Sequence, residues 1–440
     1  MRTYDEFPTI IGEMKRAAID CWMADDDYCV HFAYDDTYAL WGYVAANSYS
    51  RPGADGQGGG EFTGWISWNH PSRAPRFDEI RGYVDDWTAQ WKGLPDGSAC
   101  TAPLQATTTT AAAFGASGSG PSVQDNGEIS TANHTVSDVL ISNIKGSFVT
   151  PFHDKYYTQF SMVGYGLGAA TAILQVNYNV ENTMWDKVRD DVTNLCVNAT
   201  NAWKKQADLD ADAYGTVTLT VVGAVVGAFA TIATAGAAAP AVAALIGIST
   251  LATAGVAGIA ASASISGGSY LEIFQSLADG LMMLGDGIRK QEQSLTDMMD
   301  KSNTYILDNK PDFDLDAFAL GRYPGSDGTI SMQQANADLI STNMQRIITA
   351  LGGAQTSLGA APASSPTPRD GRVGVGADGT HGSAAALYAT VATCLTYTTS
   401  EYTLGRELFN ATVADYFQTD ADATKKVAQL AASEALSTQW

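Results

Sequence analysis

The stretch that decides the fold is residues 216–265, TVTLTVVGAVVGAFATIATAGAAAPAVAALIGISTLATAGVAGIAASASI. It forms the centre of a longer run, residues 213–271, that contains no Asp, Glu, Lys, Arg or His. Pro240 follows Gly236 and three alanines. Since proline cannot continue a helix and glycine loosens the chain, a turn is expected here. The sequence therefore predicts an apolar helical hairpin whose arms, of about twenty residues each, have the length that spans a bilayer core.

Small residues punctuate this hairpin and allow close helix contacts. Gly223 and Gly227 form a GxxxG pair around Val226 in the first arm, and Leu245 follows Pro240 in the second. Small residues let two helices approach closely, in lipid or in protein. The stretch is rich in Ala, Gly, Thr and Ser, and Ala and Gly favour membrane insertion only weakly compared with Leu, Ile and Phe. Three interpretations stay open: a hairpin buried against long helices or against copies of itself, conditional membrane insertion, and a constitutive anchor.

Long amphipathic helices are expected on both sides of the hairpin. Apolar residues recur at helical spacing in the flanking segments, which is typical of helices that bury one face. The expected helices run from Ser130, over Phe160–Asp212, Tyr270–Leu307, Ile330–Leu358 and Ser383–Phe417. No convincing alternating strand is present. The predicted fold is all-α: an elongated bundle of long helices with a central apolar helical hairpin.

Composition divides the chain into five regions. Residues 1–100 are expected to be an aromatic-rich, acidic, helical region, with helices over 34–49 and 77–91. Residues rich in Thr, Ala, Ser and Gly without periodicity are expected to be linkers or loops. The remaining divisions are a linker at 101–128, the bundle with its hairpin at 129–310, a second helical hairpin at 311–420 with a low-complexity loop at 360–382, and a polar tail at 421–440.

The charge balance excludes some partners. The formal net charge is −22, with 47 acidic and 25 basic residues. Nucleic acid is therefore not expected as a partner, and attraction to anionic lipid headgroups is disfavoured. The five cysteines are scattered without a CxxC pair, although Cys21 and Cys29 could pair in an oxidising compartment. The first residues, MRTYDEFPTIIGEMKRAAID, lack the long apolar core of a signal peptide, so any export is expected to use another route.

Motifs for catalysis and metal binding are not found. The five histidines are isolated, and neither HExxH nor GxSxG occurs. Asp208, Asp210 and Asp212 open like a calcium loop, but the glycine and the final acidic residue of that loop do not follow. We therefore expect no enzymatic activity, no cofactor and no bound metal.

Two helix–loop–helix units and one short motif carry a resemblance to a known family. Tyr416-Phe417-Gln418-Thr419-Asp420 follows a long amphipathic helix and has the Tyr-x-x-x-Asp/Glu spacing, which Tyr397–Glu401 also has within the helix. Ile144-Lys145-Gly146 lies at the turn of the first unit, with Ile in place of Trp. Over Ser130 to Asp420 this arrangement resembles the WXG-type substrates of actinobacterial type VII (ESX) secretion, including the larger Esp-like proteins. The resemblance implies that Tyr416 and Asp420 act as the secretion signal and that residues 144–146 form the hairpin turn.

The leading hypothesis for function is a non-enzymatic helical effector or structural component, exported by a type VII-like system and self-assembling. It is expected to be made in the cytoplasm and to reach the medium or the cell surface. The implied partners are the secretion machinery and a second copy or another helical chain. The alternative is an α-type pore-forming protein whose hairpin, 213–271, inserts into a membrane. An enzyme with an unrecognised site in the N-terminal region is the third possibility.

Overall fold

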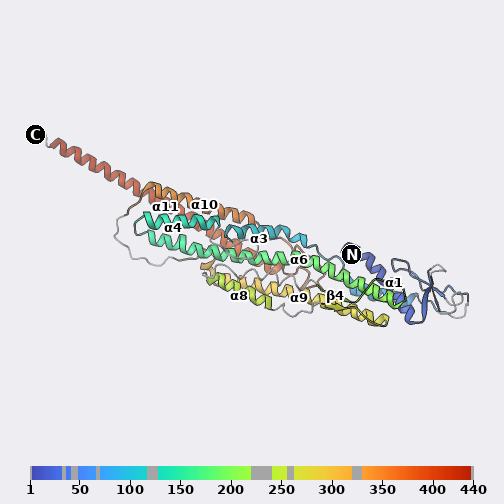
Figure 1. Ribbon diagram of the computed structural model, residues 1–440. Helices are drawn as coiled ribbons and strands as arrows, with labels where there is room; N and C mark the ends of the chain where they lie inside the picture. Colours follow the sequence, from blue (N-terminus) through green and yellow to red (C-terminus); the bar gives the residue numbers. More distant parts are fainter. Residues whose placement is uncertain are drawn as a thin grey trace.

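The protein is an elongated, mostly helical molecule in which long helices run side by side (Figure 1). The computed structural model describes residues 2–31, 36–40, 48–65, 70–115, 127–219, 240–254, 262–319 and 330–437. Helix accounts for 71 % of these residues and strand for 5 %. The largely all-α fold expected from the sequence is therefore confirmed.

Helices α6 (Phe160–Gln206) and α9 (Tyr270–Asp308) form the axis of the molecule. They are antiparallel, because the end of α6 meets the start of α9: Trp203 Nε1 donates to the carbonyl of Tyr270 at 3.2 Å. At the other end, Gly166 of α6 lies against Phe313, just beyond α9. α6 ends before Asp212, the end expected from the sequence, since Asp208 adopts a left-handed φ of 56°.

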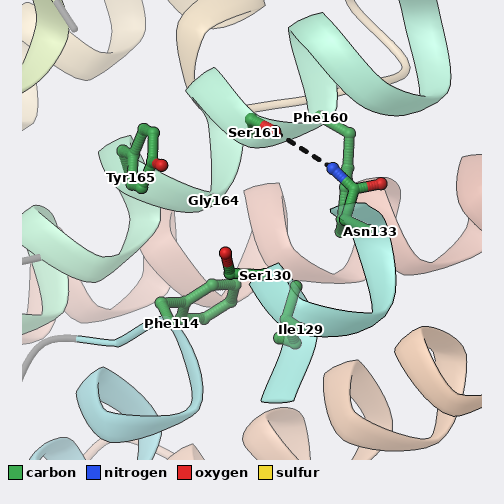
Figure 2. Close-up of a pocket in the computed structure, with 8 residues that line it drawn as sticks. All are labelled: Phe114, Ile129, Ser130, Asn133, Phe160, Ser161, Gly164 and Tyr165. Atoms are coloured by element: carbon green, nitrogen blue, oxygen red, sulfur yellow. Dashed lines mark hydrogen bonds between the residues drawn. The ribbon is translucent and has the colours of Figure 1, made fainter. Parts of the chain in front are cut away.

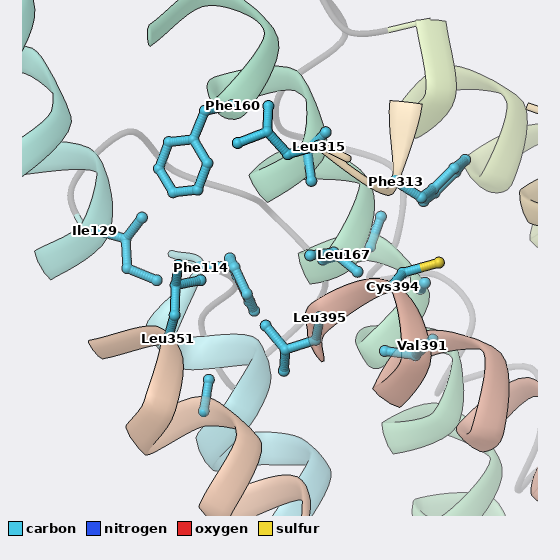
Figure 3. Packing of buried hydrophobic residues seen from close by; sticks show 14 of the residues in the cluster. Phe114, Ile129, Phe160, Leu167, Phe313, Leu315, Leu351, Val391, Cys394 and Leu395 are labelled. Carbon is cyan, nitrogen blue, oxygen red and sulfur yellow. The ribbon is translucent and has the colours of Figure 1, made fainter. Parts of the chain in front are cut away.

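The other bundle helices pack around this axis. A five-residue helix and a π-helical turn lead into α6. Helix α3 packs on α6 and on α10, and α10 also packs on α4 and α11 (Figure 1). One buried apolar cluster joins α3, α4, α6, α10 and α11, including Phe114, Ile129, Leu167, Leu351 and Leu395 (Figure 3). The elements are α3 (Thr101–Ala113), α4 (Glu128–Asn143), α5 (Val149–His153), η3 (Asp154–Gln159), η4 (Lys310–Asp312), α10 (Gln334–Leu358) and α11 (His381–Ser437).

The expected linker at 101–128 is wrong over its first half, which is α3. Threonine hydroxyls form hydrogen bonds within this helix: Thr107 and Thr108 donate to carbonyls four residues earlier at 2.9 and 2.7 Å. Thr110 is buried and also donates to the carbonyl of Ala354 on α10 at 3.2 Å. The small side chains let α3 approach α6 and α10 closely. Because Ala and Thr, and not large apolar residues, form these contacts, the sequence of α3 shows no apolar periodicity.

The N-terminal region contains a sheet that the sequence analysis missed. Three short antiparallel strands pair in the order β1-β2-β3, with Tyr38 opposite Val30 and Tyr49. The expected helix at 34–49 is therefore wrong, because β2 lies within this range and β3 begins in it. Strands of three or four residues are too short to show alternation. The elements here are η1 (Tyr4–Glu6), α1 (Phe7–Asp25), β1 (Tyr28–His31), β2 (Thr37–Leu40), β3 (Ser48–Ser50), α2 (Ala74–Ala89) and η2 (Gly97–Cys100).

Helix α8 (Pro240–Ala254) begins at Pro240, whose fixed φ suits a first turn, and the residues before it, where the turn is expected, lie outside the described part of the chain. One further boundary differs from expectation. The expected polar tail at 421–440 is helical as far as Ser437, because α11 continues beyond the bundle (Figure 1). The first arm of the expected hairpin, with Gly223, Val226 and Gly227, lies largely outside the described residues.

Candidate functional site

The apolar stretch leaves the bundle through a two-stranded neck, β4 (Thr216–Thr218) and β5 (Ser262–Ser264). The strands are antiparallel, with Thr216 opposite Ser264 and Val217 opposite Ala263. Val217 and Ala263 are buried on the bundle side, whereas the Thr and Ser neighbours are exposed. The neck therefore holds side by side the two points at which the chain enters and leaves the segment 219–261.

Hydrogen bonds attach the neck to the axial helices. Gly215 N donates to Asn198 Oδ1 of α6 at 3.2 Å, and Ile265 N donates to the carbonyl of Gly215 at 2.9 Å. On α9, Ser269 caps the helix by accepting from Glu272 N at 3.3 Å. The neck is thus tied to the adjoining ends of α6 and α9.

Helix α8 lies back along α6 and α9 (Figure 1). Ala241, Val242 and Leu245 are almost completely buried and belong to the cluster that includes Leu174 of α6 and Met298 of α9. The opposite face is exposed at Ala243. The described helix of the apolar stretch is therefore docked on one face only.

A loop between α10 and α11 binds both axial helices through buried charges. We call this loop, residues 359–380, the strap. Arg369 of the strap is fully buried and pairs with Glu292 of α9, while its guanidinium carbon lies 4.6 Å from the ring centroid of Trp185 on α6. Val375 N also donates to Glu292, at 2.9 Å. The strap is thereby anchored on α9.

A second buried carboxylate, Glu181 of α6, anchors the strap on the other helix. It accepts hydrogen bonds from Thr367 and Thr380 of the strap at 3.1 and 3.3 Å, and from Trp185 Nε1 at 2.7 Å. Arg369 is linked to Glu181 only through Thr367, whose hydroxyl accepts from Arg369 Nη1 at 3.5 Å and donates to Glu181. Burial, followed by the charge of Glu181, raises the pKa of Glu292 to about 8.

The structure places the residues predicted for secretion on α11. Asp420 is exposed where the helix extends beyond the bundle, and Tyr416 is half-buried with its ring 5.1 Å from that of Phe417. The competing pair is different, because Glu401 is nearly buried and bonded to Lys155 and Tyr156 at 2.7 and 2.9 Å. Of the two pairs, only Tyr416–Asp420 has an accessible acid.

The predicted turn at 144–146 does separate two helices. Ile144 follows α4 and is buried, and Gly146 has a φ of +150° that favours glycine. Lys145 exchanges backbone hydrogen bonds with Ser331, at 2.9 and 3.1 Å. This turn is therefore paired with the segment that precedes α10.

A small cavity between α4, α6 and the end of α3 is too small for an organic ligand (Figure 2). It is lined by Phe114, Ile129, Phe160 and Tyr165 among others, and its volume of about 20 Å³ is space for one water molecule. Asn133 donates to Ser161 Oγ beside it at 3.0 Å.

Among the described residues there is neither a metal-binding group nor a membrane-spanning helix, and the chain has no match among known proteins. In the part of the chain that the structure describes, no three His, Cys, Asp or Glu side chains form a metal-binding group. No described helix is both long and apolar enough to cross a bilayer. All five cysteines are free, so Cys21 and Cys29 are not paired. No family model, no curated protein and no solved structure matches the chain.

The sequence analysis missed the strap cluster, although a signal was present. Glu292 lies between Ile288 and Leu295, at the spacing of the apolar stripe of α9. A charged residue on an apolar stripe requires a buried partner. Nothing in the sequence indicated that this partner was Arg369, in a loop that was expected to be of low complexity.

Proposed function

We propose that this protein permeabilises membranes, and that its uncharged stretch, residues 213–271, is the part that enters the bilayer. The supporting observation is the neck: β4 and β5 join the stretch to the adjoining ends of two long antiparallel helices. Because the chain connects the stretch to the bundle at the neck, the stretch can swing away once α8 undocks, while α6 and the rest of α9 stay folded. The central apolar hairpin of the sequence prediction is part of this proposal.

Release of α8 would expose the apolar surface of α6 and α9 that it covers. Exposed apolar surface of this kind favours association. Neighbouring copies would cover the surface, so insertion and self-assembly are expected to occur together.

Ala243 gives a test that separates insertion from folding. It is exposed on α8, so Ala243→Asp should leave the soluble fold intact. A carboxylate costs about 2.5–3.5 kcal/mol at the centre of an inserted helix and less toward its ends, and Ala243 lies in the first turn of α8, so release of dye from liposomes should fall. The matched control is Ile141→Asp, because Ile141 is 59 % exposed on α4, outside the apolar stretch. Equal dye release from wild type and Ala243→Asp, or none from wild type at any protein concentration, would reject the proposal.

A second proposal concerns export by a type VII-like system, which is compatible with membrane action afterwards. Its support is the accessible acid of the Tyr416–Asp420 pair on the projecting end of α11. A Tyr and an Asp four residues apart share one helix face and can bind together in a groove of the secretion machinery.

Tyr416→Ala and Asp420→Ala should block secretion in the native host while the protein stays folded in the cell. Tyr397→Ala is the matched control, because Tyr397 lies on the same helix and is 47 % exposed. Normal amounts of both variants in the medium would exclude this signal.

A further inference from the structure

The strap joins the two axial helices at mid-length through side chains that have no contact with water. The Arg369 and Glu292 side chains are each 0 % exposed, and Glu181 is 2 % exposed. Arg369 also donates to the strap's own carbonyl of Thr367 at 3.0 Å. The strap, α6 and α9 therefore share one buried polar cluster.

A cluster of this kind behaves as a two-state contact. A buried ion pair adds little net stability compared with apolar packing, but removing one partner leaves an uncompensated buried charge at a large cost. Partial withdrawal of the strap would leave Glu292 without its guanidinium partner and Glu181 without the hydroxyl donors of Thr367 and Thr380. The strap is thus stable when fully seated or fully withdrawn, with nothing stable between.

Backbone fit limits the seated state further. Gly374 and Gly379 have left-handed φ values of 72° and 54°. A Cβ on Gly374 would collide with the Glu292 carboxylate, and one on Gly379 with the Arg369 guanidinium. The strap therefore has one seated arrangement.

We propose that the strap is a latch, whose seating holds α6 and α9 in the arrangement that docks α8 and whose withdrawal releases α8. The biological role of the latch rests on the proposed membrane function. Its mechanism rests on α6 and α9, which contact both the strap and α8. Glu181 and Glu292 lie on the same two helices that carry the docking surface of α8. A change at the strap can therefore be transmitted to α8 through α6 and α9.

Hydrogen–deuterium exchange of the intact protein without lipid tests the coupling. Arg369→Ala should make exchange about tenfold faster or more in the strap and, together with it, in residues 240–254. Arg372→Ala is the control, because this substitution removes the same charge from the same strap, whereas Arg372 is exposed and forms its ion pair with Asp370. Fast exchange in the strap with unchanged exchange in 240–254 would overturn the latch.

Gly374→Ala provides a second route if Arg369→Ala does not fold. It should unseat the strap by collision and by its backbone angle, while all three charged groups remain. Hydrogen exchange should again become faster in both the strap and residues 240–254. Exchange as slow as in the wild type in both segments would also reject the proposal.

Dye release from zwitterionic liposomes separates the two ideas. Faster release by Gly374→Ala than by wild type is expected. If 240–254 is released but neither protein causes leakage, the membrane function fails and the latch stands.

Discussion

Arg51 and Asp20 form a two-pronged ion pair at the N-terminal end of the molecule, with Nε and Nη2 of the guanidinium 2.8 and 2.6 Å from the carboxylate oxygens. Both side chains are buried, at 8 % and 2 % exposed. Tyr38 of β2 also donates to Asp20, at 2.6 Å. The pair joins α1, the sheet and the loop that follows β3, so these three elements depend on one carboxylate.

Replacing Asp20 should destabilise the N-terminal region strongly. Asp20→Ala leaves Arg51 buried with only the more exposed Asp36 as a partner. The expected loss is about 3–5 kcal/mol of unfolding free energy, measured by urea denaturation. Glu79→Ala is the control, since its pair with Arg76 is exposed and should contribute about 0–1 kcal/mol. Equal losses in the two variants would contradict the prediction.

Two nearby glycines of α6 should respond oppositely to alanine. A Cβ on Gly166 would lie 2.7 Å from the carbonyl oxygen of Asp312 and 2.9 Å from the ring of Phe313. Gly166→Ala should therefore destabilise the bundle by about 1–3 kcal/mol. Gly164→Ala meets only the Phe114 ring, at 3.8 Å, and should stabilise the helix by up to about 1 kcal/mol. Thermal unfolding of the two variants decides the matter, and a stabilising Gly166→Ala would refute the close approach.

Leu245 should hold α8 on the bundle. It is 1 % exposed, so Leu245→Ala should cost about 2–5 kcal/mol and accelerate hydrogen exchange in 240–254. Leu271→Ala makes the same change at a side chain that is 68 % exposed and should have little effect. Leu245→Asp should impair folding or assembly more severely, because its charge would be buried without a partner. Unchanged exchange in Leu245→Ala would mean that α8 is not docked in solution.

Stability should fall on the alkaline side because of Glu292. The folded-state pKa of about 8 lies above the ordinary value of 4.5, so the folded protein binds this proton more tightly than the unfolded chain does. The resulting stabilisation is fully present below about pH 4.5 and is lost as the pH rises through about 8. Urea midpoints should therefore decrease between about pH 4.5 and 8, and Glu292→Gln should flatten that decrease. Glu79→Gln should leave the profile unchanged, and a slope shared by all three proteins would exclude Glu292 as its source.

Much of the helical architecture follows from the sequence alone. Stripes such as Ile273, Leu277, Leu281 and Leu284 repeat at helical spacing, and the helix expected over 270–307 is observed at Tyr270–Asp308. Amphipathic periodicity survives in a sequence because one face meets the same apolar core along the whole helix. The absence of charged residues between 213 and 271 likewise identified the stretch whose two ends are paired in the neck.

Only the tertiary structure decided which distant residues meet. Arg369 reaches Glu292 across 77 positions, and β4 pairs with β5 across more than forty. Contacts between segments far apart in the chain leave no periodic trace, and three-residue strands carry too little pattern to be recognised. Sequence therefore determined which faces of the chain must be buried, whereas packing determined their partners, because burial is a property of each residue and pairing depends on the closure of the chain.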